Sequence, residues 1–204
     1  MNAPSGQRAG RIPPRPPPEA ADGDARERIL ATAYELFTQH GLAAVGVDRI
    51  VAEAGVAKTT LYRHFRSKAA LAVAVLERHE QLWTRKWLEP EAVRLASSPG
   101  EGPIAIFDAL DEWFGQADFE GCLFINSLLE TRAHASPVRK AAITAIENVY
   151  DVVQRLLEQA GIANSAAVAH QIQLLMRGCI VAAVAGQADA VKQGRVAAQR
   201  LLEA

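Results

Sequence analysis

The amino-acid sequence predicts an all-α protein, on the evidence of its composition and of the spacing of its apolar residues. Half of the 204 residues are apolar, which is enough to build a sizeable core. Alanine and leucine dominate and β-branched runs are scarce, a balance that favours helices over strands. From about residue 24 onwards, apolar residues recur at the spacing of amphipathic helices.

The first predicted helix begins at Asp24, which can cap the free amides together with Glu27 three residues later. Its apolar face consists of Ile29, Ala33, Leu36 and Phe37. Gly41 is expected to end this helix, because glycine adopts a left-handed conformation without a steric penalty. Residues 1–22 are rich in proline, glycine and arginine and are expected to form a flexible tail, because they cannot bury enough apolar surface.

Two short helices are predicted over 47–54 and 58–65, joined by a sharp turn at Gly55. Leu61 and Phe65 are expected to face the core. Between Ala54 and Leu76 the chain has no acidic residue and carries four cations, namely Lys58, Arg63, Arg66 and Lys68. Because the net charge of the chain is only −1, this positive charge is local. Such a face fits phosphates and base edges, and a merely solvated helix face is the alternative.

The rest of the chain is predicted to consist of further helices. The fourth is expected to start after Ser67 and to stop at Pro90, because proline lacks the amide that continues a helix. A break rich in serine, proline and glycine follows at 97–103. The later helices are expected at 104–116, 122–133, 137–160, 164–185 and 189–204.

Two segments, ILATAYELFTQHG and VDRIVAEAGVAKTTLYRHFRSK, together resemble the DNA-binding domain of the TetR/AcrR family of bacterial transcriptional regulators. The resemblance covers about residues 24–83 and combines Leu-Phe then Gly, Ala-Gly-Val at the turn, Thr-Leu-Tyr-Arg-His-Phe and Ser-Lys. It implies a tail at 1–22, a helix-turn-helix DNA-binding domain at 23–83 with the motif at about 46–65, and a ligand-binding and dimerisation domain at 84–204.

The candidate DNA contacts follow from the resemblance and from the geometry of a helix in the major groove. The first residues of such a helix face the base edges, so Lys58 and Thr59 are expected to contact bases or phosphates. The other candidates would reach phosphates through hydroxyl, imidazole or cationic groups: Thr60, Tyr62, Arg63, His64, Lys68 and Arg49. Packing is the alternative role for His64, and plain solvation for Arg63 and Arg49. The tail arginines could enter a minor groove, but a solubilising tail is the simpler interpretation.

Five positions depart from the family pattern. Gly46 stands where the family usually has Thr or Ser, and Ala57 replaces the usual Ser at the start of the third helix. Val51 replaces an Ala that packs on the third helix, and Ala69-Ala70 replace an acidic pair. Glycine is sterically tolerable as a cap at position 46, but one contact to the DNA backbone is expected to be lost. None of these departures is expected to remove the DNA-binding face.

The candidate effector contacts are aromatic and polar side chains of the predicted ligand-binding domain. They are Trp87, Phe107, Trp113, Asn126, Glu130 and His134. The last three recur every four residues, which places them on one face of a single helix. An apolar pocket with a few polar anchors is one interpretation. Plain core packing for the aromatic residues and a solvated stripe for the polar ones are the alternatives.

The two cysteines, Cys122 and Cys179, lack the spacing of a disulfide framework or a zinc site, which fits a reducing compartment. A thiol sensor acting through Cys122 is the alternative function, since a helix N-terminus lowers a thiol pKa. No nucleophile–base pair, glycine-rich phosphate loop or metal cluster is evident, so neither an enzyme nor a cofactor or metal is expected. No membrane span is expected either, and the predicted location is the cytoplasm.

The last two predicted helices carry closely spaced small residues, namely Gly178, Ala182, Ala183, Ala185 and Gly186. The resemblance implies that these helices form a homodimer interface, with intramolecular packing as the alternative. A two-fold dimer would read a pseudo-palindromic double-stranded DNA operator. The sequence thus predicts a ligand-responsive regulator, by family a repressor, that an unknown small-molecule effector releases from DNA.

Overall fold

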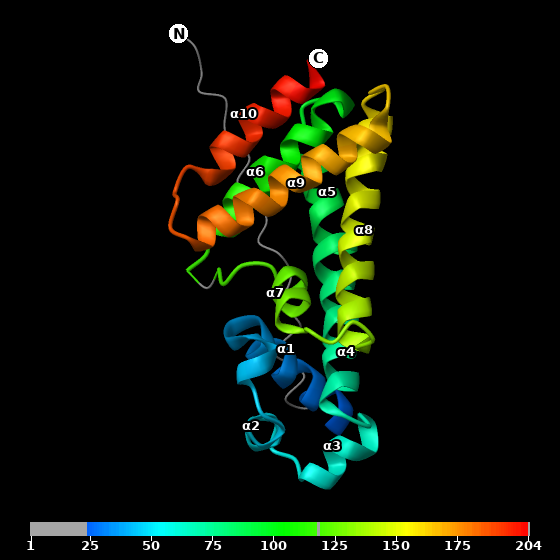
Figure 1. Ribbon diagram of the computed structural model, residues 1–204, viewed down its shortest axis with the longest axis vertical. Coiled ribbons are helices and arrows are strands. Elements are labelled where there is room, and N and C mark those ends of the chain that lie inside the picture. Colours follow the sequence, from blue (N-terminus) through cyan, green and yellow to red (C-terminus); the bar gives the residue numbers. More distant parts are fainter. Residues whose placement is uncertain (1–23, 118, 204) are drawn as a thin grey trace. The chain divides into compact units, whose positions relative to one another are not determined.

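The computed structural model describes residues 24–117 and 119–203, and every regular element in these ranges is a helix (Figure 1). The all-α prediction is therefore confirmed, while the tail predicted at 1–22 lies outside the described residues. The described chain forms two compact units. The amino-terminal unit contains 24–86 and 120–151, and the carboxy-terminal unit contains 87–119 and 152–203. The domain boundary between residues 83 and 84 stays a prediction.

The amino-terminal unit begins with α1 (Ala25–Ala44), α2 (Val47–Glu53), α3 (Lys58–His64) and α4 (Lys68–His79). Asp24 caps α1 as predicted, because its side chain accepts a hydrogen bond from the amide of Glu27 at 2.9 Å. Gly41 interrupts α1 with a φ of 77°. The next turn uses Gly55, whose φ is 62°, a value that L side chains rarely adopt. The core of the amino-terminal unit includes fully buried side chains, namely Ile29, Phe37, Ile50, Leu61 and Leu71.

The predicted stop at Pro90 is wrong. Three helical elements follow one another without a loop: α4, the π-helix η2 (Glu80–Leu88) and α5 (Glu89–Leu95). Pro90 lies in the first turn of α5. At this point the i→i+5 pattern of η2 changes to the α-helical pattern. Because the first amides of an α-helix have no partner within it, proline is tolerated there and does not end the helix.

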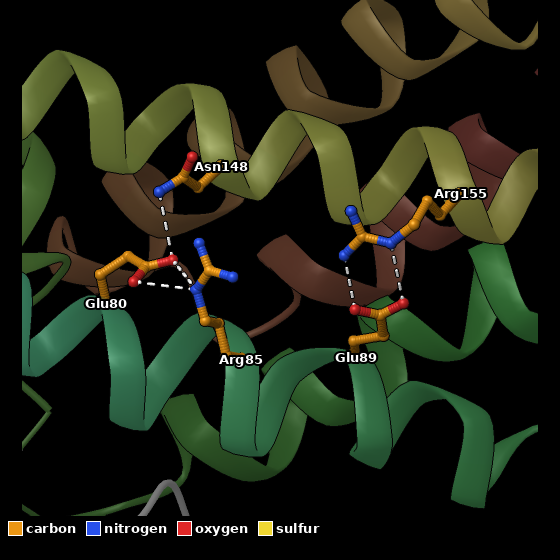
Figure 2. A network of polar contacts seen from close by, with 5 residues as sticks. All are labelled: Glu80, Arg85, Glu89, Asn148 and Arg155. Atoms are coloured by element: carbon orange, nitrogen blue, oxygen red, sulfur yellow. Dashed lines mark hydrogen bonds and ion pairs between the residues drawn. The ribbon is translucent and has the colours of Figure 1, made fainter.

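A hydrogen bond to a buried carboxylate and a surface ion pair connect the helix α8 (Pro137–Gln159) to these elements (Figure 2). In the amino-terminal unit, the buried Glu80 carboxylate accepts from Arg85 Nε at 2.8 Å and from Asn148 Nδ2 at 3.1 Å. In the carboxy-terminal unit, the Arg155 guanidinium donates two hydrogen bonds to Glu89, at 3.1 and 2.6 Å. Each unit thus contains a polar contact to its own part of α8.

Helix α7 (Leu123–Glu130) is shorter than the predicted 122–133. The backbone of Thr131 is extended, and the Arg139 side chain donates to the carbonyls of Leu128 and Thr131 at 3.4 and 3.3 Å. These bonds satisfy acceptors that a longer helix would have used itself. His134 therefore lies outside α7, and the prediction that it shares a helix face with Asn126 and Glu130 is wrong.

The carboxy-terminal unit packs α5, α6 (Gly102–Phe114), α9 (Ser165–Val184) and α10 (Ala190–Leu202) together, after a 3-10 turn at Pro99–Glu101. Figure 1 shows α9 and α10 side by side. Among the described residues, α9 is long and apolar enough to cross a membrane by length and composition alone, with a third of it buried. Core helices of soluble proteins meet the same criterion, so this observation is weak evidence for a membrane span.

Candidate DNA-binding surface

Helix α3 presents one face to the core and the other to solvent. Leu61 is fully buried and Phe65 is 4% exposed, as predicted, and they fix the rotation of α3 about its axis. Tyr62 is 44% exposed, and Lys58 and Thr59 are exposed at the start of the helix. Because the residues on the two faces differ in this way, the cations and hydroxyls of α3 can reach a ligand as large as a duplex.

Lys58 forms an ion pair across the turn between α2 and α3. Its Nζ donates to Asp48 Oδ1 at 2.7 Å, and both side chains are more than half exposed. The hydrogen bond and the charge of Asp48 raise the pKa of Lys58. Exposed pairs of this kind are weak and are screened by salt. A phosphate can therefore compete with Asp48 for the ammonium group.

The remaining candidates on and near α3 differ in their exposure to solvent and in their existing polar contacts. Arg63 is exposed, whereas Thr60 and His64 are half-buried. Arg49 is engaged on the surface, since Nε donates to Glu53 at 2.7 Å and Nη2 lies 3.0 Å from His40 Nε2. Arg49 would have to exchange these contacts for a phosphate.

Lys68 points away from the N-terminus of its own helix. Its Nζ donates to the carbonyl of Leu42 at the end of α1 and lies 6.0 Å from the centre of the Phe37 ring. Burial lowers the pKa of Lys68, and the charge of Glu130 partly offsets this effect. The structure thus gives Lys68 an internal partner that its position in the sequence did not reveal.

The departures at Gly46 and Ala57 leave α2 and α3 without side-chain caps. Gly46 has an extended backbone with a φ of −83°, and an added Cβ there would meet nothing within 4 Å. Neither steric crowding nor backbone strain therefore requires glycine at this position. Val51, the third departure, is half-buried in α2.

The six candidate effector contacts are divided between the two units. In the carboxy-terminal unit, Trp87 and Phe107 are buried in the core, and Trp113 packs edge-on against Trp87 with ring centres 6.3 Å apart. In the amino-terminal unit, the Asn126 amide donates to the Glu120 carbonyl at 3.2 Å. Glu130 accepts from the Ala43 amide, and His134 is exposed in a turn.

Several buried polar groups of the amino-terminal unit were not predicted from the sequence. His79 is buried, with Nδ1 2.8 Å from the Tyr34 hydroxyl and its ring 4.8 Å from that of Phe124. His79 Nε2, Thr84 Oγ1 and Ser127 Oγ are buried without a hydrogen-bond partner among the described residues. A histidine four residues after Val75, on the apolar face of α4, was the signal available in the sequence.

The burial of His79 predicts a loss of stability in mild acid. Burial lowers the pKa of His79 from 6.5 to about 3, so the unfolded chain binds the extra proton between these values. The free energy of unfolding is therefore unaffected by this group above the pKa of His79 in the unfolded chain. Below that pKa it falls by about 1.4 kcal/mol per pH unit. In urea unfolding, we expect acidification from about pH 7 to about pH 5 to cost the wild type roughly 2 kcal/mol more than His79→Gln. Equal losses would show that His79 is accessible to protons in the folded state.

The cysteines and possible metal ligands do not form a reactive centre in the described part of the chain. Cys122 precedes α7 and is only 6% exposed, and Cys179 is buried beside α10. Neither is in a disulfide. Burial raises the pKa of Cys179. Within the described ranges no three histidine, cysteine or carboxylate side chains come together as a metal site.

Comparisons with known proteins agree with this geometry. The family model described as "Bacterial regulatory proteins, tetR family" matches residues 29–75. The HTH-type transcriptional regulator LmrA of Bacillus subtilis is 30% identical over 147 residues, 71% of this chain and 77% of that protein. The HTH-type transcriptional activator FasR of Mycolicibacterium smegmatis is 28% identical over 163 residues, 79% of this chain and 69% of that protein.

A solved structure gives the same result over nearly the whole chain. SCO4454, a TetR-family transcriptional regulator from Streptomyces coelicolor, superposes with a TM-score of 0.79 at 28% identity. The match covers 90% of this chain and 97% of that one. The family, its helix-turn-helix and its lack of enzymatic activity are those that the sequence predicted. The chain belongs to the TetR family of bacterial regulatory proteins, and it is a DNA-binding transcriptional regulator.

Proposed function

We propose that this regulator binds a pseudo-palindromic operator as a homodimer and is released from it by a small-molecule effector, acting as a repressor. The observation that carries this proposal is the exposed face of α3, with Lys58 and Tyr62 accessible and Leu61 buried behind them. A helix held in this way can insert its first residues into the major groove. The proposed location is the cytoplasm, where the operator DNA lies.

The proposed DNA contacts are graded by their surroundings. Lys58 and Thr59 contact base edges or phosphates, and Thr60, Tyr62, Arg63 and His64 contact phosphates. Arg49 contributes only by leaving Glu53 and His40. Lys68 contributes mainly by holding the Leu42 carbonyl, so its effect on DNA binding is indirect.

The proposed dimer interface is an exposed apolar stripe on α9. Leu174, Val181 and Val184 are 64%, 59% and 59% exposed, and Gly178 is exposed between them. Residues 174, 178 and 181 share one helix face, and exposed apolar stripes of this kind favour association. Ile180, on another face of α9, is buried.

Val181→Arg is expected to convert the dimer into monomers, because it places a charge in an apolar contact that cannot solvate it. Sedimentation should then report about half the mass of the wild type at equal concentration. The matched control is Lys192→Arg, an exposed position on α10 where charge is kept. A Val181→Arg protein that remains dimeric would place the interface elsewhere.

The proposed effector site includes buried polar groups that the sequence did not single out. The Nε2 atom of His79 and the hydroxyl groups of Thr84 and Ser127 are shielded from water, and Trp83 and Phe124 lie against the His79 ring. Because His79 stays neutral at physiological pH, these groups suit an uncharged, largely apolar effector with a hydrogen-bonding oxygen or nitrogen. The six residues named from the sequence stay predictions.

The experiment that tests the proposal begins with selection of duplexes from a random pool by the wild-type protein. A pseudo-palindromic consensus is expected, with half-sites about one helical turn or a multiple apart. Affinity for the selected duplex should fall steeply as salt rises. A screen for compounds that raise the melting temperature would then supply effectors, which should release the duplex. Failure to select any duplex would refute the proposal.

Two features of the proposal need separate tests. FasR is named as an activator, so the sign of regulation is tested with a reporter placed downstream of the selected duplex. Repression predicts higher reporter output when the regulator is absent. The thiol-sensing alternative is not favoured, because Cys122 is buried. Oxidant treatment should leave duplex binding of the wild type and of Cys122→Ser equal.

A further inference from the structure

The peptide unit between Leu42 and Ala43 is held from both sides by charged side chains of two other helices. Its carbonyl, on Leu42, accepts from the Nζ of Lys68, the first residue of α4. Its amide, on Ala43, donates to Oε2 of Glu130, the last residue of α7, at 2.7 Å. In a trans peptide these two groups point in opposite directions. We call Lys68, Glu130 and this peptide unit the peptide clamp.

Gly41 makes room for the carboxylate of the clamp. A Cβ built on Gly41 would lie 2.4 Å from Glu130 Oε1, closer than real Cβ atoms approach a neighbour. The φ of Gly41 is also 77°, which disfavours any other residue. The local backbone and the absence of a side chain thus both suit a carboxylate at this place.

The clamp lies immediately before the helix-turn-helix. Ala43 is followed by Ala44, the fully buried Val45, and Gly46, which precedes the first residue of α2. Gly46 provides no side-chain cap that could orient α2. The orientation of α2 therefore depends more on the peptide unit between Leu42 and Ala43. The position of α2 in turn sets that of α3, since the two helices share the Gly55 turn.

The surroundings of the clamp allow Glu130 to leave it. An open groove of about 220 Å³ lies here. Its lining includes all parts of the clamp, namely Leu42, Ala43, Lys68 and Glu130. Glu130 is on the exposed side, so water can replace the amide as its partner. The contact between α7 and α1 can therefore open and close without disrupting the core.

We infer that Glu130 is a positioning residue for DNA binding, which acts through the Ala43 amide to set the orientation of α2 and α3. This role differs from the effector contact that the sequence predicts for Glu130, which stays a prediction. The inference rests on the proposed use of α3 on DNA. Any effector that displaces α7 would act on the helix-turn-helix through this carboxylate, since α7 ends at Glu130.

Charge alone predicts the opposite effect of removing Glu130. DNA is a polyanion, so loss of a carboxylate near the DNA-binding unit would raise affinity through electrostatics. The clamp predicts that Glu130→Ala lowers affinity, because the amide loses its acceptor. Glu130→Gln keeps an acceptor oxygen and removes the negative charge, so it should bind at least as tightly as the wild type.

The test combines amide exchange in the free protein with binding of a duplex selected by the wild type. In Glu130→Ala the Ala43 amide should exchange about tenfold faster, and duplex affinity should fall about fivefold to tenfold, as expected for one lost hydrogen bond. Glu130→Gln should behave as the wild type in both measurements. The control is Glu147→Ala, which removes an exposed carboxylate of α8.

The outcomes separate the clamp from the proposed DNA binding. Unchanged Ala43 exchange in Glu130→Ala, or duplex binding as tight as that of the wild type, would overturn the inference. Loss of affinity in Glu130→Gln equal to that in Glu130→Ala would also overturn it, because the acceptor would then be irrelevant. If the wild type selects no duplex, the proposed operator binding fails, and the exchange measurement alone decides whether the clamp orders the peptide.

Discussion

Lys58→Ala is expected to weaken binding to the selected duplex by about tenfold or more, and Tyr62→Phe by about fivefold, at fixed salt. Lys58 is the first residue of α3 and its ammonium is half exposed, so it can reach a base edge or a phosphate. One such contact contributes roughly 1–3 kcal/mol. Tyr62 loses only its hydroxyl in the variant, and its ring keeps its packing. Gel-shift titration measures both effects.

The ion pair with Asp48 supplies an internal check on the Lys58 result. Asp48→Ala removes the competitor for the ammonium and an exposed negative charge, so this variant should bind the duplex more tightly than the wild type. If Lys58 contacts a phosphate, Lys58→Ala should also reduce the slope of log affinity against log salt by about one. A base contact would leave that slope unchanged.

Controls decide whether these losses come from the contact or from the fold. Both side chains are exposed, so the melting temperatures of Lys58→Ala and Tyr62→Phe should match that of the wild type within the small range typical of surface substitutions. Lys192→Ala removes an exposed lysine from α10 and should leave duplex affinity nearly unchanged. Wild-type affinity in both α3 variants would defeat the assignment of α3 as the recognition helix.

The short helices of the DNA-binding unit could be predicted because their signals are local. Gly55 indicated a turn that requires a positive φ, and the structure has 62° there. The spacing of Leu61 and Phe65 predicted which face of α3 is buried. Periodicity alone does not explain the exposure of Lys58, because Lys58 precedes Leu61 by three residues and shares its side of the helix. Lys58 is exposed as the first residue of α3. Few long-range contacts are needed to reach these conclusions.

Where the prediction failed, a distant side chain or a second use of the same residue decided the structure. Pro90 was expected to end a helix, but proline also suits the first turn of a helix. The π-helix η2 ends at Leu88, so Pro90 lies in the first turn of α5. The end of α7 at Glu130 depends on Arg139 from α8. Lys68 was assigned from its place at a helix N-terminus, and no sequence pattern reports that the Leu42 carbonyl lies within its reach.

The groups that sequence analysis missed share one physical property. His79, Thr84 and Ser127 are polar residues in largely apolar helices, and their importance lies in burial without a partner. Burial depends on which helices meet, which a single sequence does not determine. Glu130 illustrates the same limit, since its partner Ala43 is 87 residues away along the chain.

Gly194→Ala is expected to destabilise the carboxy-terminal unit by about 2 kcal/mol, because overpacking a filled core typically costs 1–3 kcal/mol. Gly194 is buried in α10. A Cβ at this position would lie 2.2 Å from Cys179 Sγ and 3.2 Å from Phe107 Cε1. Both neighbours are buried, so neither side chain can move into solvent to make room.

Helix propensity opposes this expectation, so the sign of the change in unfolding free energy in Gly194→Ala is informative. Alanine is favoured over glycine in a helix by about 1 kcal/mol, so the clash must exceed that gain for Gly194→Ala to be destabilising. Gly178→Ala on α9 is the matched control in a monomeric background such as Val181→Arg, because an added Cβ there meets nothing within 4 Å. It should stabilise the protein by up to about 1 kcal/mol.

A second substitution identifies the atom responsible for the clash. Cys179→Ala removes the sulfur, so Gly194→Ala should cost clearly less in the Cys179→Ala background than in the wild type, with a coupling of about 1 kcal/mol or more. Urea unfolding at one protein concentration measures all four proteins, since dimerisation makes apparent stability depend on concentration. Additive losses would mean that Phe107 or the backbone, and not the sulfur, resists the new methyl group. No loss in Gly194→Ala would mean that α10 can move away from α9 and α6 at little cost.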